Sequence, residues 1–459
     1  MTLFGTAGIR GPVAEITPSL ALAVGQAAGE PGETFVVGRD GRETGPALAA
    51  AMEAGLESAG ADVYRIGRVP TPALAFASRG RRGVMLTASH NPPSDNGIKL
   101  FVDGVEYDRE AERSIEAAVD ANDTEPAPWN EWGHSDRLAV LEEYRDAVTA
   151  YVRGRFVGDD DRGDVLAGLS IAVDCGNGMG GLATPQVLER LGADVVAVNA
   201  NVDGHFSARP SKPTPETLSE FSSFLASGTF DVGLAHDGDA DRLVVTGPDG
   251  AVIHEDTVLA VVAAHYVTQS DAADPVVVTT PNASARIDER VRDAGGRVER
   301  VRLGALHEGI ARERRRADDD TAVVFAAEPW KHVHPALGGW IDGVASAALV
   351  AGLVAGAGDT DALRAPVTER PYRKVSVDCP DERKADAMAA LETELPATFP
   401  DATVDTDYGV RLEFSDASWI LVRPSGTEPY VRIYAESDEV DDLVERASDV
   451  VETAVDDAA

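Results

Sequence analysis

The sequence predicts an α/β protein with three tandem domains of like topology, followed by a smaller C-terminal α+β domain. The first reason is length, because 459 residues are too many for one hydrophobic core and correspond to about three or four domains. The second is a weak threefold repeat of an apolar run, a helical stretch, a glycine turn and another apolar run, as in a βαβ unit. The third is the change from Pro371 onward to alternating strands and two helical stretches.

Each copy of the repeat contains three strand-like runs. The first runs are 35–40, 171–178 and 276–282, and glycine turns lead into the second runs at 59–63, 191–195 and 294–298. The third runs end in loops with reactive or charged side chains, at 85–90, 232–242 and 323–328. Ligands bind beyond the carboxyl ends of strands in open α/β sheets, so we expect the three loops to face one central cleft.

The repeat and the composition of the segments between its copies suggest domain boundaries. We expect domains at residues 1–155, 156–250, 251–370 and 371–459. The first ends before a charged link at 158–164. The uncharged run 343–358 is shorter than the roughly 20 apolar residues of a membrane span, so it predicts a helix packed within a domain.

The net charge of −37, from 78 acidic and 41 basic residues, argues against nucleic acids and anionic membranes as partners. Salt screens such self-repulsion, so we expect a salt-adapted, halophilic cytoplasmic protein. Cys175 and Cys379 are too few for a disulfide framework, and the first ten residues lack the pattern of a secretory signal. We expect a small-molecule partner and a monomer or weak homodimer.

The loop at 83–92 places a hydroxyl, an imidazole, an amide and a proline at the end of an apolar strand. Pro92 disfavours helical geometry at the residue before it, so the loop presents Ser89 beyond the strand end. His90 adjoins the serine and Lys99 follows ten residues after it. The pattern indicates a reactive serine on a stiff turn, and a polar turn between core strands is the alternative for Ser89 and His90 alone.

Asp237, Asp239 and Asp241 occupy alternate positions after another apolar strand. Alternation lets three carboxylates converge, and oxygen ligands suit Mg²⁺. An EF-hand does not fit, because the sixth position is Arg242 and the twelfth is Pro248. A solvated acidic turn is the alternative, although an arginine beside a metal site is useful where phosphate oxygens also bind.

Two further regions suit phosphate binding. The loop 423–429 between two strand-like runs offers backbone N–H groups, hydroxyls and an arginine, with a plain hairpin as the alternative. The residues expected to bind there are Arg423, Ser425, Gly426, Thr427 and, in the following strand, Arg432. Arg10, Arg39 and Arg42 lie among glycines, where they suit phosphate or ordinary surface ion pairs.

The segment 176–181 fits the G-x-G-x-x-G spacing of a dinucleotide site. The next strand ends in Asn199-Ala200-Asn201 and supplies no acidic residue for a ribose. Close packing of strand against helix therefore explains these glycines better than a cofactor site does.

Taken together, these loops resemble the α-D-phosphohexomutase family, which includes phosphoglucomutase/phosphomannomutase and phosphoglucosamine mutase. The resemblance covers essentially the whole chain and is carried by 4–11, 87–92, 237–242 and 423–429. It implies an isomerase that interconverts hexose 1-phosphate and hexose 6-phosphate through a phosphoserine and a bound hexose 1,6-bisphosphate. Glucose, mannose and glucosamine phosphates all remain open as substrates.

The resemblance also implies roles for individual residues. Ser89 would be phosphorylated, and its phosphate with Asp237, Asp239 and Asp241 would hold one Mg²⁺ per chain. Lys99 and His90 match positions near the transferring proton, Arg10 and Arg242 match contacts to the phosphoserine, and the loop at 423–427 matches the one that holds the other phosphate. A lysine acting as general base needs a lowered pKa, through burial or a neighbouring positive charge.

One loop departs from the family pattern. The sugar loop usually reads Gly-Glu-x-Ser-Gly-His, whereas residues 327–332 keep only Glu328 and His332 from the ends of the pattern, with Trp330 and Lys331 between them. The segment 304–307 also lacks a lysine often found there, which Lys331 would restore. Glu328, Lys331 and His332 are the expected sugar-binding residues.

Two other functional classes remain as alternatives. A nicotinamide-dependent oxidoreductase would use the glycines at 176–181. A non-catalytic sugar-phosphate-binding protein would not need the intact Ser89 and Lys99, because binding alone requires no nucleophile.

Overall fold

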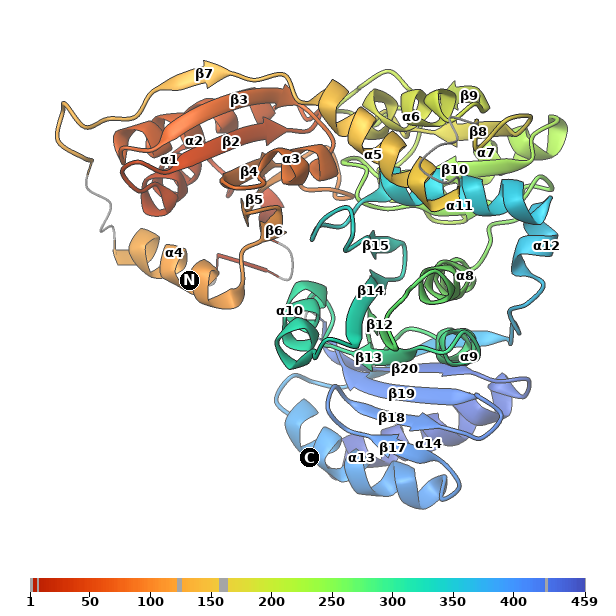
Figure 1. The fold of residues 1–459 in the computed structure, drawn as a ribbon. Coiled ribbons are helices and arrows are strands. Elements are labelled where there is room, and N and C mark those ends of the chain that lie inside the picture. The colour runs from red at the N-terminus through yellow and green to blue at the C-terminus, as the bar shows by residue number, and fades with distance from the viewer. Residues whose placement is uncertain (1–2, 6–7, 122–125, 157–163, 426–427, 459) are drawn as a thin grey trace. The chain divides into compact units, whose positions relative to one another are not determined.

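The structure is a computed structural model that describes residues 3–5, 8–121, 126–156, 164–425 and 428–458 (Figure 1). The chain forms two compact units. Unit 1 comprises Met1–Glu255 with Trp330–Leu363, and unit 2 comprises Asp256–Pro329 with Arg364–Ala459.

The first sheet of unit 1 has the strand order β1-β5-β4-β2-β3-β7, with β6 paired to β5. Its strands are β1 (Ile9–Pro12), β2 (Thr34–Arg39), β3 (Asp62–Arg68), β4 (Arg82–Leu86), β5 (Asp95–Val102), β6 (Val105–Glu106) and β7 (Ser135–Arg137). Its helices are α1 (Pro18–Ala28), α2 (Gly45–Ser58), α3 (Thr71–Ala77) and α4 (Arg109–Ala121). The sheet is mixed, because β2 runs parallel to β3 and β4 whereas β5 runs antiparallel to β4.

The second sheet of unit 1 has the order β11-β10-β8-β9 and is also mixed. Its strands are β8 (Ser170–Asp174), β9 (Asp194–Val198), β10 (Val232–Ala235) and β11 (Val244–Thr246). The elements around it are α5 (Leu141–Phe156), the 3-10 turn η1 (Met179–Leu182), α6 (Thr184–Arg190), α7 (Ser219–Ser227), β15 (Lys331–Val333) and α11 (Gly343–Ala357). Helix α11 packs on α5 and α6, which confirms that the run 343–358 is a helix within a domain.

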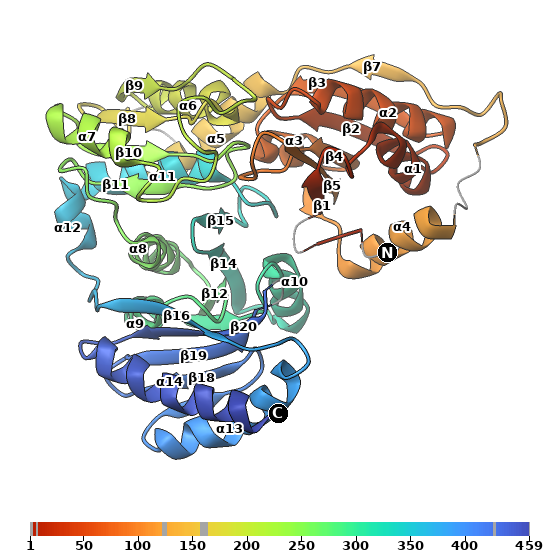
Figure 2. The ribbon, with the colours of Figure 1, turned by 180° about the vertical axis from the view of Figure 1, so that it is seen from behind.

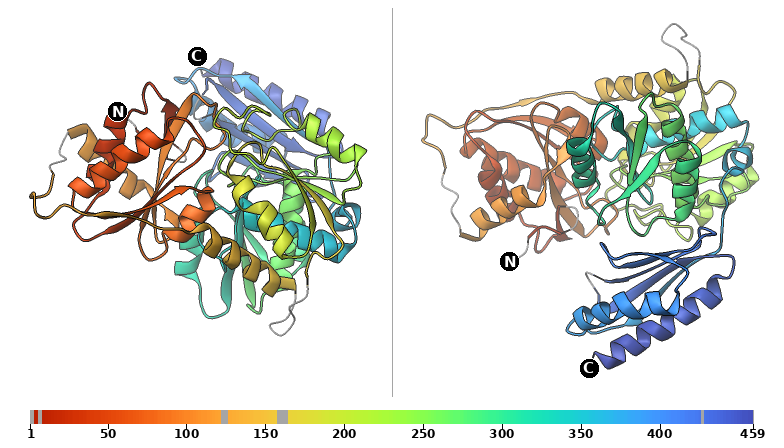
Figure 3. Two further views of the ribbon diagram at one scale, coloured as in Figure 1. Left: turned by 90° about the horizontal axis from the view of Figure 1, so that it is seen from above. Right: turned by 60° about the horizontal axis from the view of Figure 1, so that its bottom comes forward.

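Unit 2 contains a parallel sheet and an antiparallel sheet. The parallel part comprises β12 (Asp274–Thr279), β13 (Arg297–Arg300) and β14 (Thr321–Glu328), with α8 (Glu255–Thr268), α9 (Ala285–Asp293) and α10 (Leu306–Arg316). After α12 (Thr360–Arg364), the antiparallel order β16-β20-β19-β18-β17 uses β16 (Tyr372–Asp378), β17 (Thr403–Asp405), β18 (Val410–Glu413), β19 (Trp419–Pro424) and β20 (Tyr430–Glu436). Helices α13 (Lys384–Thr398) and α14 (Val440–Asp457) lie side by side on one face of this sheet (Figure 2; Figure 3, right).

The three copies of the repeat share one topology. In each copy the first strand lies in the middle, and the second and third strands pair with it in parallel on either side, giving β4-β2-β3, β10-β8-β9 and β14-β12-β13. The predicted fold class is therefore confirmed: tandem α/β units with helix-flanked sheets and a C-terminal domain built on an antiparallel sheet. The predicted boundaries at 155, 250 and 370 stay predictions.

The strands at the centre of each sheet are buried because both faces are covered. Phe35, Val36 and Val37 in β2 are buried, as are Val276, Val277 and Val278 in β12. Continuous apolar runs of this kind are typical of parallel strands between helices. Among the described residues, no helix has the length and apolar character that crossing a membrane requires.

Candidate active site

Ser89 lies in the loop that follows β4, at the carboxyl end of a parallel strand. Its side chain is 1% exposed, and its Oγ donates a hydrogen bond to Asp237 Oδ2 at 2.8 Å. Its backbone has a φ of 49°, in the left-handed region that non-glycine residues rarely adopt. Residues far apart in the sequence therefore fix the position of this hydroxyl.

The buried guanidinium of Arg42 holds the serine loop in place. It donates to the carbonyl oxygens of Ser89 at 2.9 Å and Asn91 at 2.8 Å, and also to those of Pro92 and Asp95. Asp40 accepts a bond from Arg42 Nε at 3.0 Å. All three nitrogens of the Arg42 guanidinium thus donate to buried or partly buried protein acceptors. This corrects the expectation that Arg42 binds phosphate or forms a surface ion pair. Sequence reasoning missed this role because backbone acceptors leave no sequence pattern.

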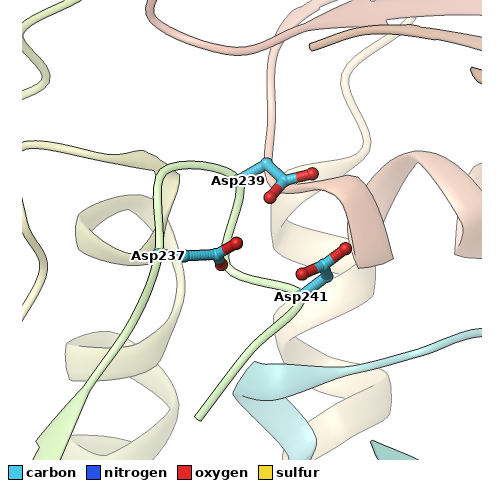
Figure 4. Close-up of side chains that lie close together, drawn as sticks. All are labelled: Asp237, Asp239 and Asp241. Atoms are coloured by element: carbon cyan, nitrogen blue, oxygen red, sulfur yellow. The ribbon is translucent and has the colours of Figure 1, made fainter. Parts of the chain in front are cut away.

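The three aspartates that follow β10 converge, as their spacing predicts (Figure 4). One oxygen from each of Asp237, Asp239 and Asp241 lies within 4.8 Å of the others, and all three side chains are buried. Two ligands of Mg²⁺ lie at most about 4.2 Å apart, because each is about 2.1 Å from the ion, so small side-chain adjustments suffice for one ion.

The chemistry of the aspartates also fits a cation. Oδ1 of Asp239 and Oδ1 of Asp241 are buried and accept no hydrogen bond from any described residue. Burial, together with the charges of Asp241 and Asp239, raises the pKa of Asp237 well above its usual range. Buried acceptors without donors are costly, and a divalent cation would satisfy them. The residues present therefore fit Mg²⁺.

Neighbouring loops fix the shape of the metal loop. Thr71 at the start of α3 donates through Oγ1 to Asp239 Oδ2 at 2.6 Å. The imidazole of His236 joins the two ends of the loop, with Nδ1 2.8 Å from the carbonyl oxygen of Arg242. Burial lowers the pKa of His236 to about 4, so this imidazole is neutral at neutral pH.

The glycine segment 176–181 supports the metal loop. The N–H of Met179 donates to the carbonyl oxygen of Gly238 at 2.9 Å. A Cβ on Gly178 would lie 2.6 Å from that same oxygen, and a Cβ on Gly238 would lie 2.8 Å from the carbonyl oxygen of Ser89. These contacts give the glycines a packing role, which supports the interpretation preferred from the sequence over a dinucleotide site.

Several cations surround the aspartates. Lys99 Nζ lies 3.1 Å from Asp241 Oδ2 and 3.6 Å from Asp239 Oδ2. Burial lowers the pKa of Lys99, but the carboxylates of Asp241, Asp239 and Glu106 outweigh it and raise the pKa above its usual value. Beside these carboxylates Lys99 carries a positive charge, and its role near the transferring proton stays a prediction.

His90 and two arginines also lie close to the serine and the aspartates. His90 Nδ1 is 3.4 Å from Ser89 Oγ. Burial, then the charges of Arg242 and Arg10, lower the pKa of His90 to about 2. Among the described residues, Nε of Arg10 and Nε of Arg242 have no hydrogen-bond acceptor, although Arg242 Nε lies 3.7 Å from Asp237 Oδ2. Both guanidinium groups thus retain donors for an anion.

The residues predicted to bind sugar fall into different units. Glu328 belongs to unit 2, where its Oε1 accepts a bond from the N–H of Gly304 at 2.6 Å. Lys331 belongs to unit 1 and pairs with Arg242 in an antiparallel bridge. His332 is 2% exposed, and burial lowers its pKa to about 4. Lys331 is therefore brought to the metal loop, which the sequence did not indicate.

The predicted phosphate loop lies between β19 and β20 in unit 2. Arg423 stands over the ring of Tyr434, and Arg432 Nη2 donates to Glu428 Oε2 at 3.0 Å. Ser425 is buried, whereas the predicted residues Gly426 and Thr427 lie outside the described residues. Lys384, which sequence reasoning missed, donates through Nζ to the carbonyl oxygens of Ser425 at 2.7 Å and Glu428 at 2.6 Å.

Three models of known protein families match this sequence. Models of phosphoglucomutase/phosphomannomutase alpha/beta/alpha domain I, alpha/beta/alpha domain II and the C-terminal domain match residues 1–126, 142–250 and 375–453. A protein of Thermococcus kodakarensis named phosphopentomutase is 40% identical over 445 residues, which are 95% of this chain and 94% of that protein. The chain belongs to the phosphoglucomutase/phosphomannomutase family.

Other relatives agree with this assignment. A probable phosphoglucosamine mutase of Methanopyrus kandleri is 40% identical over 451 residues, covering 95% of this chain and 94% of that protein. A solved phosphoglucomutase/phosphomannomutase family protein from Burkholderia thailandensis has a TM-score of 0.84 at 25% identity and covers 100% of this chain and 97% of that one. The predicted family is thus confirmed, and the enzyme is a phosphomutase, an isomerase.

The phosphomutase brings most of the predicted transfer residues together within unit 1. The contacts described above link seven of these residues: Ser89, His90, Lys99, Asp237, Asp239, Asp241 and Arg242. The charge of Arg10 contributes to the lowered pKa of His90. Their individual functions, like those of Glu328, His332 and the residues of the C-terminal loop, stay predictions.

Proposed function

We propose that this phosphomutase moves a phosphoryl group between the 1- and 6-positions of a hexose through a phosphoserine at Ser89. The observation that carries the proposal is the 2.8 Å bond from Ser89 Oγ to Asp237, one of three buried aspartates that converge. A hydroxyl tied to a candidate metal ligand is suited to exchange its proton for a phosphoryl group.

In the proposed cycle, the bond between phosphorus and Ser89 Oγ breaks as a bond to the sugar hydroxyl forms, which gives a bound hexose 1,6-bisphosphate. The proton of the sugar hydroxyl ends on Ser89 Oγ, which becomes a hydroxyl again. The neutral imidazole of His90, with Nδ1 3.4 Å from that oxygen, is proposed to carry the proton while Lys99 stays a cation. After the intermediate turns over, its other phosphoryl group returns to Ser89 Oγ and the product hydroxyl regains a proton. Phosphoryl transfer depends on positioning and on neutralised charge, so the neighbouring cations are central to it.

Asp237, Asp239 and Asp241 would hold Mg²⁺ with the phosphate on Ser89. Bound there, the ion supplies charge neutralisation for the transferring phosphoryl group. A solved N-acetylphosphoglucosamine mutase from Aspergillus fumigatus, with a TM-score of 0.64 at 17% identity, is described in complex with GlcNAc-6P and magnesium. Arg423, Ser425, Gly426, Thr427 and Arg432 are proposed to bind the phosphate that is not transferred.

Among hexose phosphates we favour glucosamine phosphate. Several relatives carry the name probable phosphoglucosamine mutase, including one from Methanosphaera stadtmanae at 35% identity over 95% of this chain. A second candidate is a pentose phosphate, because the Thermococcus kodakarensis relative at 40% identity is named phosphopentomutase.

A coupled assay with glucose 1-phosphate, mannose 1-phosphate, glucosamine 6-phosphate and ribose 1-phosphate tests the proposal. Each reaction contains Mg²⁺, high salt and a trace of the matching bisphosphate. We expect turnover of at least one sugar, loss of turnover in Ser89→Ala, and a mass increase of about 80 Da in the wild type after incubation with bisphosphate. Absence of both turnover and added mass would refute the proposed function.

A further inference from the structure

Lys331 occupies a position next to the metal loop. It begins β15 and pairs with Arg242 in an antiparallel bridge. The N–H of Leu243 also donates to the carbonyl oxygen of Trp330 at 2.9 Å. The backbone at 330–331 therefore runs alongside the residues that directly follow the third aspartate of the loop.

Among the residues that the structure describes, Lys331 forms no ion pair within 4.0 Å. Lys99 lies within 4.0 Å of three carboxylates, whereas Lys331 has none that close among the residues the structure describes. Lys331 pairs with Arg242 beside the metal loop and is half-buried, so its side chain remains accessible to a ligand. An uncommitted cation beside a phosphate-transfer site is suited to an anionic group.

The charge of Lys331 affects the pKa of both Asp241 and His90. Burial raises the pKa of Asp241, but the charges of Lys99 and then Lys331 lower it below its usual range. Burial and the charges of Arg242 and Arg10 lower the pKa of His90, and Lys331 adds to this effect. One ammonium therefore interacts with a metal-loop aspartate and with the neighbour of the nucleophile.

Trp330 fixes the backbone of Lys331. Its φ is 68°, a left-handed conformation that is strained for a residue with a side chain. The indole packs against a buried cluster formed by Ala172, Leu218, Phe221, Leu225, Ala235 and Val244. Burial of a large aromatic ring offsets such a cost. Trp330 and Lys331 both depart from the family pattern, and packing of the tryptophan positions the lysine.

We propose that Lys331 contacts the phosphoryl group during its transfer to and from Ser89, as a further cation of the transfer site, and that Trp330 is its positioning residue. The ligand class is a phosphoryl group, not the sugar ring that the sequence alone suggested for Lys331. The lysine makes and breaks no covalent bond. This proposal rests on the proposed function of Ser89.

Steady-state kinetics distinguish a contact with the phosphoryl group from a contact with the sugar ring. Lys331→Gln and Lys331→Arg are measured with every sugar that the wild type converts. A charged hydrogen bond to the transferring group is worth about 1.5–3 kcal/mol, so Lys331→Gln is expected to lower kcat about 10- to 100-fold. The factor should be the same for each sugar, with KM changed less than about threefold, and Lys331→Arg should recover most of kcat. A sugar-dependent rise in KM with unchanged kcat would overturn the proposal.

Lys212→Gln is the matched control, because Lys212 is exposed and its Nζ lies 5.9 Å from the centre of the Trp330 ring. It should keep kcat within about twofold, which separates the role of Lys331 from the general loss of one charge. Trp330→Ala should lower kcat in the same sugar-independent way, and Trp330→Phe should retain more of it. Equal kcat in Trp330→Ala and wild type would refute the positioning role.

A binding experiment keeps the proposal testable without turnover. Calorimetric titration of the dephosphorylated full chain in Mg²⁺ with inorganic phosphate should show about tenfold weaker binding for Lys331→Gln than for wild type and Lys212→Gln. Equal binding by all three proteins would count against Lys331 whatever the substrate proves to be. If wild type and Lys331→Gln differ here but no sugar is converted and no phosphoserine forms, the proposed function fails while the anion contact stands.

Discussion

Removal of the Arg42 side chain tests how the nucleophile loop is held. Arg42 is 1% exposed, and its guanidinium donates to four carbonyl oxygens of the segment 89–95. Its Nε donates to Asp40 Oδ2 at 3.0 Å. In Arg42→Met these carbonyls lose their donor, and the carboxylate of Asp40 stays buried without its cation. Burial already raises the pKa of Asp40, and the charge of Arg42 opposes that rise.

The size of the effect follows from the buried ion pair. Adding about 1.5–3 kcal/mol for every charged hydrogen bond would overstate the loss, because water satisfies the same groups in the unfolded chain. Breaking a buried pair by removing one partner costs about 3–5 kcal/mol. At about 2 °C or more for each kcal/mol, Arg42→Met should lower the melting temperature of unit 1 by at least about 6 °C.

Activity supplies an independent measurement. Ser89 is held through its carbonyl oxygen, so Arg42→Met should also lower kcat by about 100-fold at a temperature where the variant is folded, since misplacement by about 1 Å can cost that much. Arg42→Lys keeps the positive charge but has fewer hydrogen-bond donors. Its melting temperature and its kcat should therefore lie between those of Arg42→Met and wild type. The exposed Arg68, changed to Met, is the control and should leave both quantities nearly unchanged. A melting temperature within about 2 °C of wild type and a kcat within twofold for Arg42→Met would refute this account.

Three further predictions concern the metal loop, acid stability and unit 2. Gly238→Ala would place a Cβ 2.8 Å from the carbonyl oxygen of Ser89 and 2.6 Å from Ser211 Oγ, so activity should fall at least about tenfold, and unchanged kcat would contradict the close packing. His332 has a pKa of about 4 in the folded protein against 6.5 for an exposed imidazole. The unfolded chain therefore binds a proton at His332 before the folded protein does, and the free energy of unfolding falls by about 3 kcal/mol between about pH 6.5 and pH 4. Urea midpoints of His332→Gln should depend less on pH across that window than those of wild type. In unit 2, Arg286→Leu should destabilise the fold by about 3–5 kcal/mol in urea unfolding, because Arg286 Nη2 lies 2.7 Å from the buried Glu436 Oε1, and adding Glu436→Gln should restore part of the loss if the pair is the cause.

The convergence of Ser89 on Asp237 could be predicted from the sequence because both follow the third strand of equivalent βαβ copies. Strand ends of like topology are recognisable from short apolar runs and glycine turns, so the fold class was predictable as well. The role of Arg42 was not, because its acceptors are backbone carbonyls that any residue offers. The position of Lys331 was not predictable either, because the family pattern describes sugar contacts for this loop and gives no sign of a bridge to Arg242.

The overall charge of the protein and the charge of its transfer site lead to opposite expectations for an anionic substrate. A net charge of −37 should repel a sugar phosphate, whereas Lys99, Arg242 and Lys331 adjoin the metal loop. Screening resolves the conflict, because at about 0.15 M salt exposed charges beyond about 8 Å contribute little while partly buried ones keep their effect. Salt should therefore favour entry of the substrate by weakening distant repulsion more than local attraction, and KM for a sugar phosphate should fall as salt rises from low concentration. A KM that rises steadily with salt from the lowest concentrations would show that the local cations, and not the acidic surface, dominate the encounter.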